Sequence, residues 1–114
     1  MLTFDFREML RQIANDVLQK KDVKLISTAF HETVVQALVE AMSRLQKSYA
    51  HFNKRIVLSG GCFHNRYLKE RLVEQLSASG FEVLTHRRIP CNDGGLSYGQ
   101  LMVAAAKREE LTCV

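Results

Sequence analysis

Two short turns contain the residue types best suited to chemistry in this chain. The first is SGGCFHN at residues 59–65, and the second is PCNDGG at residues 90–95. Each follows an apolar run typical of a strand and precedes a segment with helical periodicity. A strand that ends at paired glycines and continues as a helix directs backbone N–H groups toward a phosphate. We therefore expect the two turns to face each other across one crevice that binds a nucleotide.

The residues of the first turn have both a structural and a functional interpretation. Gly60 and Gly61 match neither the GxGxxG fingerprint nor the phosphate loop that ends in GK[ST]. A tight turn with positive φ explains the pair as well as a ligand does. Asn65 is suited to cap the next helix or to contact a ribose or base. His64 lies inside the turn, where it could touch a ligand.

The second turn offers a candidate metal ligand. Asp93 is suited to be a helix cap, a turn residue or a ligand, and Gly94 and Gly95 leave room for a large group to approach. The four histidines form no HxxxH or HExxH motif, so a metal on Asp93 would need ligands from outside this chain. His31 has no assigned role. No arrangement for nucleophilic catalysis stands out, so the catalytic residues are unknown.

Cysteine chemistry is restricted by number and spacing. The chain has three cysteines, Cys62, Cys91 and Cys113, and no CxxC pair. This excludes a disulfide framework and a typical zinc knuckle. Cys62 and Cys91 each lie in one of the two turns, where a thiol could serve as a nucleophile or ligand, or simply fill a tight space. The roles of all three stay unassigned.

Length and composition describe one ordinary globular domain. The chain has 114 residues, 46% hydrophobic and 25% charged, with no apolar run long enough to span a membrane. We expect no membrane partner and a cytoplasmic location. The net charge of +4 reflects either a solvated basic face or a bias toward phosphate-bearing ligands. Nucleic acid is not an expected partner, because no recognition motif accompanies the charge.

Hydrophobic periodicity predicts the order α-α-β-α-β-α. Asp5 and Asp22 are expected to cap the first two helices, and a right-handed crossover makes the two strands parallel. The continuous apolar run of the first strand favours a parallel strand covered on both faces. A sheet of two strands is only marginally stable by itself, so we expect the chain to be a partial domain. We also expect its exposed strand edge to promote dimers. The predicted elements are helices after Asp5 to about residue 19, over about 23–49, over 65–79 and after Asp93 to about residue 107, and strands over 55–59 and 81–85.

A family resemblance rests on four segments taken together: VLSGGCFHN at 57–65, GF at 80–81, THRRIP at 85–90 and NDGGL at 92–96. They resemble the C-terminal end of the hydrogenase maturation carbamoyltransferase family, HypF, over about residues 56–106. FHET at 30–33 is similar to that family's helix before the strand. The resemblance implies an α/β fold, namely the C-terminal lobe of an actin-like ATPase (ribonuclease H-like) domain. Such a domain is similar to the tRNA threonylcarbamoyl transferase domain.

The resemblance also implies a reaction and a site. The family uses carbamoyl phosphate and ATP to form carbamoyl-adenylate, and passes the carbamoyl group to the C-terminal cysteine of HypE for the cyanide ligand of [NiFe] hydrogenase. Gly60, Gly61 and Asn65 would bind nucleotide, and Asp93 would bind a divalent metal. Residues 1–114 would be one partial domain of a larger carbamoyltransferase. The chain by itself is expected to be inactive.

Three alternatives stay open at this point. The tRNA threonylcarbamoyladenosine transferases share the glycine pair and the Asp turn, although CFHN and NDGG look closer to the hydrogenase version. A small-molecule O-carbamoyltransferase is a further relative. The third alternative is a non-catalytic lobe that only binds nucleotide or the maturation partner. A natural reading frame that extends several hundred residues upstream would favour the enzyme.

Overall fold

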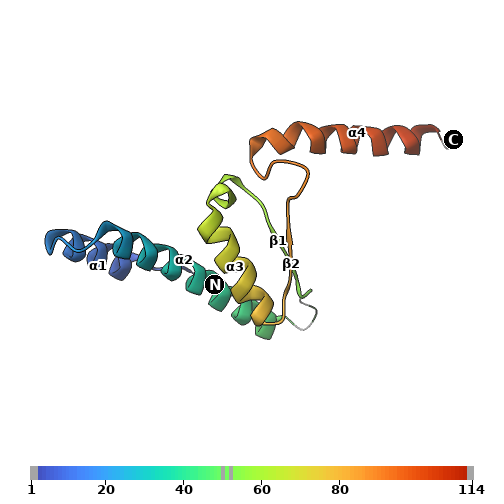
Figure 1. Cartoon of the computed structure of the whole chain (residues 1–114). Coiled ribbons are helices and arrows are strands. Elements are labelled where there is room, and N and C mark those ends of the chain that lie inside the picture. The colour runs from blue at the N-terminus through green and yellow to red at the C-terminus, as the bar shows by residue number, and fades with distance from the viewer. Residues whose placement is uncertain (1–2, 50, 52, 113–114) are drawn as a thin grey trace.

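The computed structural model describes residues 3–49, 51 and 53–112, and its order of elements is the predicted α-α-β-α-β-α (Figure 1). Two short 3-10 turns, η1 and η2, precede the third and fourth helices. The elements are α1 (Arg7–Leu18), α2 (Val23–Ser48), β1 (Arg55–Leu58), η1 (Gly61–His64), α3 (Arg66–Ala78), β2 (Glu82–Thr85), η2 (Asp93–Gly95) and α4 (Leu96–Thr112).

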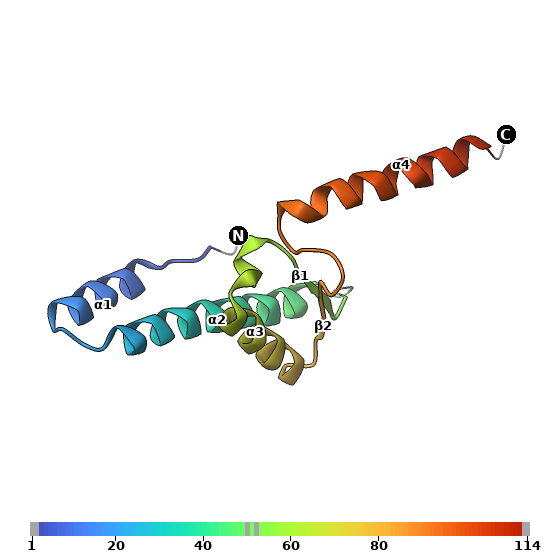
Figure 2. The ribbon, with the colours of Figure 1, turned by 45° about the horizontal axis from the view of Figure 1, so that its top comes forward.

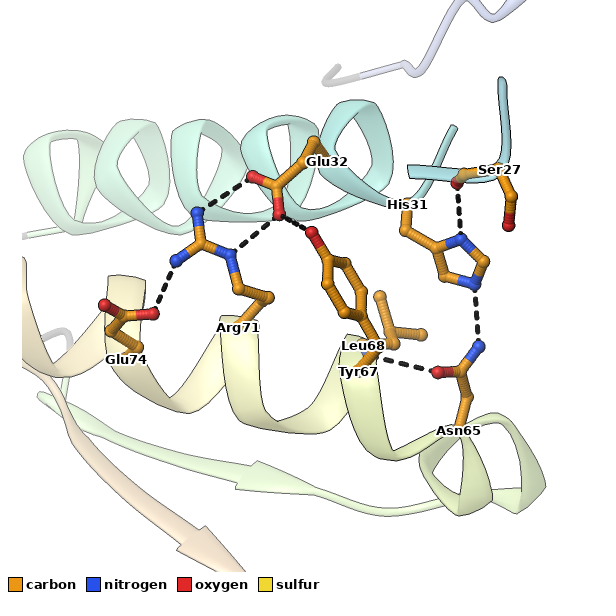
Figure 3. A network of polar contacts seen from close by, with 8 residues as sticks. All are labelled: Ser27, His31, Glu32, Asn65, Tyr67, Leu68, Arg71 and Glu74. Atoms are coloured by element: carbon orange, nitrogen blue, oxygen red, sulfur yellow. Dashed lines mark hydrogen bonds and ion pairs between the residues drawn. The ribbon is translucent and has the colours of Figure 1, made fainter. Parts of the chain in front are cut away.

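The two strands pair in parallel, as the crossover rule predicted. Arg55 lies opposite Glu82 and Leu58 lies opposite Thr85. The first of these pairs is also an ion pair, in which Arg55 Nε lies 2.6 Å from Glu82 Oε2. Helix α3, the crossover between the strands, lies between the sheet and α2 (Figure 3). The parallel pairing brings the carboxyl ends of both strands to the same edge of the sheet.

A small core joins these three layers. Its members come from α2, both strand regions and α3, and they are Val35, Leu58, Leu72, Leu76 and Phe81. Leu72 and Leu76 are four residues apart and so lie on one face of α3. Because Leu72 is almost completely buried, truncating it to Ala would cost about 2–5 kcal/mol. The core therefore fixes α3 against α2, and with it the residues at the start of α3.

The sheet is covered on one face only, so the expectation that the first strand is covered on both faces was wrong for the described part of the chain. Val57 and Leu84, which lie opposite each other, keep 63% and 44% of their surface exposed. Helix α4 extends away from the sheet instead of packing on it (Figures 1 and 2), and its described side chains through residue 108 are all exposed. The periodicity showed which residues are apolar but not which neighbour covers them.

Because α4 extends away from the sheet, the overall shape is elongated. The radius of gyration is 18.9 Å, whereas a compact domain of this length would have about 13 Å. The α1–α2 arm and α4 project in different directions from the central α3 and sheet (Figure 2). Within the described residues, no helix is both long and apolar enough to cross a membrane.

Helix termini agree with the sequence in most places. Asp22 caps α2 as predicted, and its carboxylate accepts a hydrogen bond from the Lys24 N–H at 2.9 Å. Asp5 lies one residue before the cap of α1, which is Phe6, but its carboxylate still accepts from the Arg7 N–H. Asp5 therefore supports the first turn without being the capping residue.

Candidate functional site

The two glycine-containing turns are joined directly. The backbone N–H of Gly60 donates a hydrogen bond to the carbonyl oxygen of Cys91 at 2.7 Å. Beside it, His86 Nε2 lies 2.9 Å from the Ser59 hydroxyl oxygen. The segments that follow parallel strands emerge at the same edge, which is where ligands bind in open α/β sheets. The structure thus brings together the two turns that the sequence singled out.

Glycine stands at positions 60 and 61 of the first turn for two different physical reasons. Gly60 has φ of 117° and ψ of 157°, a conformation that is essentially restricted to glycine. Gly61 begins η1 without a positive φ, and a Cβ atom built on it would meet no atom within 4 Å. Of these two positions, therefore, only position 60 requires glycine for its backbone conformation. The open space at Gly61 would let another group approach the backbone closely.

Asn65 caps helix α3 and contacts α2. Its Oδ1 accepts from the Leu68 N–H at 3.1 Å, and its Nδ2 lies 2.7 Å from Nε2 of His31 (Figure 3). These two bonds use one of the two lone pairs on the amide oxygen and one of the two amide N–H groups. A ligand could use the others, so capping and ligand contact are compatible at Asn65.

A cavity of about 410 Å³ lies between α2, η1 and the start of α3. Gly61 and Asn65 line it, whereas Gly60 does not. An apolar wall with a few polar groups is typical of small-molecule sites. Its full lining is Phe30, His31, Val34, Gly61, Cys62, Asn65 and Leu68.

His64 lines a different cavity, of about 220 Å³, between the first turn and the segment after β2. Lys69 and His86 line the same cavity, so three basic side chains gather there together with Cys91. Such a group favours anionic ligands. The sequence indicated basic residues near both turns, but it did not show that these three side chains share one cavity. The members of this group come from separate segments, so no local pattern indicates it.

In the second turn, the capping residue is Asn92. Its side-chain oxygen accepts from the Gly94 N–H at 3.1 Å. Asp93 is exposed, and its carboxylate forms no hydrogen bond or ion pair with any described residue. A Cβ atom at Gly95 would lie only 2.6 Å from the carbonyl oxygen of Pro90. The missing side chain at Gly95 thus leaves room for the carbonyl group of Pro90, which belongs to the chain's own backbone.

Metal and thiol chemistry is limited in the part of the chain that the structure describes. No group of three or more His, Cys, Asp or Glu side chains there could hold a metal ion. An unpartnered carboxylate such as Asp93 suits hard divalent cations, but only as one ligand among several. Cys62 is exposed and Cys91 half-buried, and both are free thiols. Cys113 lies outside the described residues.

A polar clasp, formed by Glu32, Tyr67 and Arg71, joins α2 to α3. Glu32 accepts hydrogen bonds from Arg71 Nε at 2.7 Å, from Arg71 Nη2 at 3.0 Å and from the Tyr67 hydroxyl at 2.7 Å (Figure 3). The Arg71 guanidinium, helped by the Tyr67 hydroxyl, holds the pKa of Glu32 at about 2. The hydrogen bond between the Tyr67 hydroxyl and the Glu32 carboxylate raises the pKa of Tyr67. The partners are 35 and 39 positions apart, so the local sequence pattern did not reveal the clasp.

The fold and the joined turns define the class of protein. Two parallel strands linked by a helical crossover, with both turns at their carboxyl ends, form the C-terminal lobe of an actin-like, ribonuclease H-like α/β domain. Residues 1–100 match the family model described as the carbamoyltransferase Kae1-like domain, second subdomain. The chain therefore belongs to this carbamoyltransferase family, and the resemblance to HypF is confirmed.

Individual relatives agree with this assignment. Carbamoyltransferase HypF of Rhodobacter capsulatus is 40% identical over 74% of this chain, which spans 11% of that protein. HypF2 of Cupriavidus necator is 43% identical over 66% of the chain and 9% of the relative. A crystal structure of full-length HypF in a phosphate- and nucleotide-bound form is 45% identical, with a TM-score of 0.76 over 83% of this chain and 12% of that one. The chain thus spans about a tenth of these relatives' length.

Proposed function

We propose that this chain is the nucleotide-binding lobe of a HypF-type carbamoyltransferase, and that residues 1–114 form one partial domain completed by other parts of a larger enzyme. The hydrogen bond between Gly60 and Cys91 carries the proposal, because it joins the two turns at one edge of the sheet. The solved relative in a phosphate- and nucleotide-bound form gives independent support.

The geometry suggests how a nucleotide is divided between these groups. The phosphates would lie at Gly60 and Gly61, where the backbone is open to close approach. The nucleoside would enter the cavity of about 410 Å³, whose apolar side suits a base. The free N–H and lone pair of Asn65 suit ribose hydroxyls or a base edge. His64 would contact the ligand only from the neighbouring cavity that it lines.

The complete enzyme would hydrolyse carbamoyl phosphate to carbamate and inorganic phosphate. A carbamate oxygen would then attack the α-phosphorus of ATP, which forms carbamoyl-adenylate and releases pyrophosphate. The thiolate of the C-terminal cysteine of HypE would then attack the carbamoyl carbon, and AMP would leave with the electron pair of the broken C–O bond. Such a transfer depends on positioning and on stabilisation of developing charge rather than on a local acid–base pair. This lobe would contribute the positioning of the adenylate.

Asp93 would supply one ligand to a divalent metal whose other ligands lie outside this chain. Asp93 suits this role because its carboxylate is exposed and has no partner among the described residues. A bound metal would neutralise negative charge on the phosphates. Because the described residues offer no complete ligand set, we expect the chain by itself to bind nucleotide without transferring a carbamoyl group.

The proposal is tested by an NMR titration of the chain with ATP and with AMP, each with and without Mg²⁺. We expect shifts of the backbone signals of Gly60 and Gly61, of Asn65, and of the turn that contains Asp93. Signals of the exposed helix α1 serve as an internal control and should stay unchanged. If millimolar nucleotide causes no shifts here but does so in the full-length enzyme, the chain is not a self-sufficient binding lobe.

A further inference from the structure

His31 connects helix α2 to the residue that caps α3. Its Nδ1 lies 2.7 Å from the carbonyl oxygen of Ser27, and its Nε2 lies 2.7 Å from Nδ2 of Asn65 (Figure 3). A carbonyl oxygen can only accept, so the network assigns the proton to Nδ1. In a neutral imidazole, Nε2 is then the acceptor for the amide of Asn65.

This chain of bonds determines which way the Asn65 amide points. The amide nitrogen must face His31, which leaves the amide oxygen to accept from the Leu68 N–H at 3.1 Å. The two bonds require the same orientation and so reinforce each other. The ring of His31 is itself packed edge-on between Phe30 and Tyr67, with ring centroids 5.3 and 5.7 Å away.

The orientation matters because His31 and Asn65 line the same cavity as Gly61. With one N–H given to His31 and one lone pair given to Leu68, Asn65 keeps one donor and one acceptor. An unrestrained amide would rotate and offer these groups in several directions. Ordering a side chain before the ligand arrives removes part of the entropy cost of binding.

We propose that His31 is a positioning residue for nucleotide binding, which holds the Asn65 amide in the orientation that meets the ribose or base. This inference rests on the proposed function, because it assumes that the cavity takes the nucleoside. His31 would act through Asn65 and not on the reacting atoms. The sequence left His31 without a role because its partner is 34 positions away.

The test compares the wild-type chain with His31→Ala, His31→Gln and Tyr67→Phe. The affinity for ATP and the side-chain amide signals of Asn65 are both followed by NMR. We expect His31→Ala to weaken binding by about 2- to 10-fold, the effect of one less ordered side chain. His31→Gln restores an acceptor for Asn65 and should keep most of the affinity. Tyr67→Phe removes a different α2–α3 hydrogen bond and should bind like wild type.

Several results would overturn the inference. One is equal affinity in His31→Ala and wild type, and another is an equal loss in His31→Gln. A third is a loss in Tyr67→Phe as large as that in His31→Ala, which would indicate general loosening of the two helices. If wild type itself does not respond to ATP, the proposed function fails for this chain. The ligand-free amide signals of Asn65 would then still show whether His31 holds that side chain.

Discussion

Glu32 on α2 and Arg71 on α3 form a two-point ion pair, with Nε 2.7 Å from Oε1 and Nη2 3.0 Å from Oε2. The two side chains are about 30% exposed, so the pair lies partly in the shelter of the helix interface. A guanidinium that meets a carboxylate at two points fixes orientation as well as distance. The pair therefore reinforces the orientation in which the core packs α3 on α2.

The first prediction concerns pH and this ion pair. The pKa of Glu32 is about 2 in the folded chain, below its ordinary value of 4.5. The stabilisation by its carboxylate is therefore complete above about pH 4.5 and is lost as the pH falls toward 2. Urea unfolding should show Glu32→Gln less stable than wild type at neutral pH, with a much smaller difference at about pH 2.5.

A matched control for that experiment is Glu70→Gln. Glu70 pairs with Arg66 within α3, and both side chains are mostly exposed. Exposed pairs of this kind contribute little, so this variant should unfold close to wild type at both pH values. If the difference between Glu32→Gln and wild type does not depend on pH, the ionised pair is not what stabilises the α2–α3 contact.

The second prediction separates the two neighbouring glycines. Gly60→Ala should cost about 1–3 kcal/mol of stability, because φ of 117° is strained for any residue with a Cβ atom. Gly61→Ala should change stability by less than about 0.5 kcal/mol, because its Cβ atom enters open space. We nevertheless expect Gly61→Ala to weaken ATP binding. Thermal unfolding and an ATP titration of both variants provide the check, and unchanged ATP affinity in Gly61→Ala would argue against phosphate at this position.

The third prediction concerns Asp93 in the full-length enzyme. Asp93→Ala should leave the fold intact and abolish carbamoyl transfer, because the described contacts give its carboxylate no structural partner. Asn92→Ala is the structural counterpart and should cost about 1 kcal/mol, because Asn92 is the capping residue. The measurements are a transfer assay and thermal unfolding. Unfolding of the Asp93→Ala enzyme would show that this carboxylate has a mainly structural role.

The fourth prediction concerns association of the chain. Within the described residues, each strand has one unpaired edge, and such an edge is a template for pairing. We expect dimers at high concentration in sedimentation, and weaker association in Val57→Lys, which places a charge on the exposed face of β1. Leu101→Glu on the exposed α4 is the comparison. Monomeric wild type, or dimers lost only in Leu101→Glu, would count against association through the strands.

Much of the fold was predictable because its signals are local. The Asp22 and Asn65 caps each depend on a side chain and an N–H within three residues. The positive φ of Gly60 and Gly80 follows from the turns that they occupy. The helical spacing of apolar residues in α3 coincides with its buried face, which contains Leu72 and Leu76. These features need no information about the rest of the chain.

The packing of α2 was predicted less well. Phe30 and Val35 both belong to its wide apolar stripe, yet Phe30 is 39% exposed and Val35 is completely buried. The exposure of Val57 and the outward course of α4 were also not evident. An apolar residue signals that burial is favourable, but the signal does not identify the covering partner. Part of this surface has no cover within the described residues.

By itself, the sequence determined the order of the elements, the caps of α2 and α3 and the two glycine-containing turns, because each depends on interactions between near neighbours. Only the tertiary structure decided that Gly60 meets Cys91, that His31 orients Asn65 and that Glu32 pairs with Arg71. These contacts join residues about 30 to 40 positions apart. The packing of the buried leucines of α3 between α2 and the sheet sets the distances between the helices, and no local sequence pattern specifies those distances.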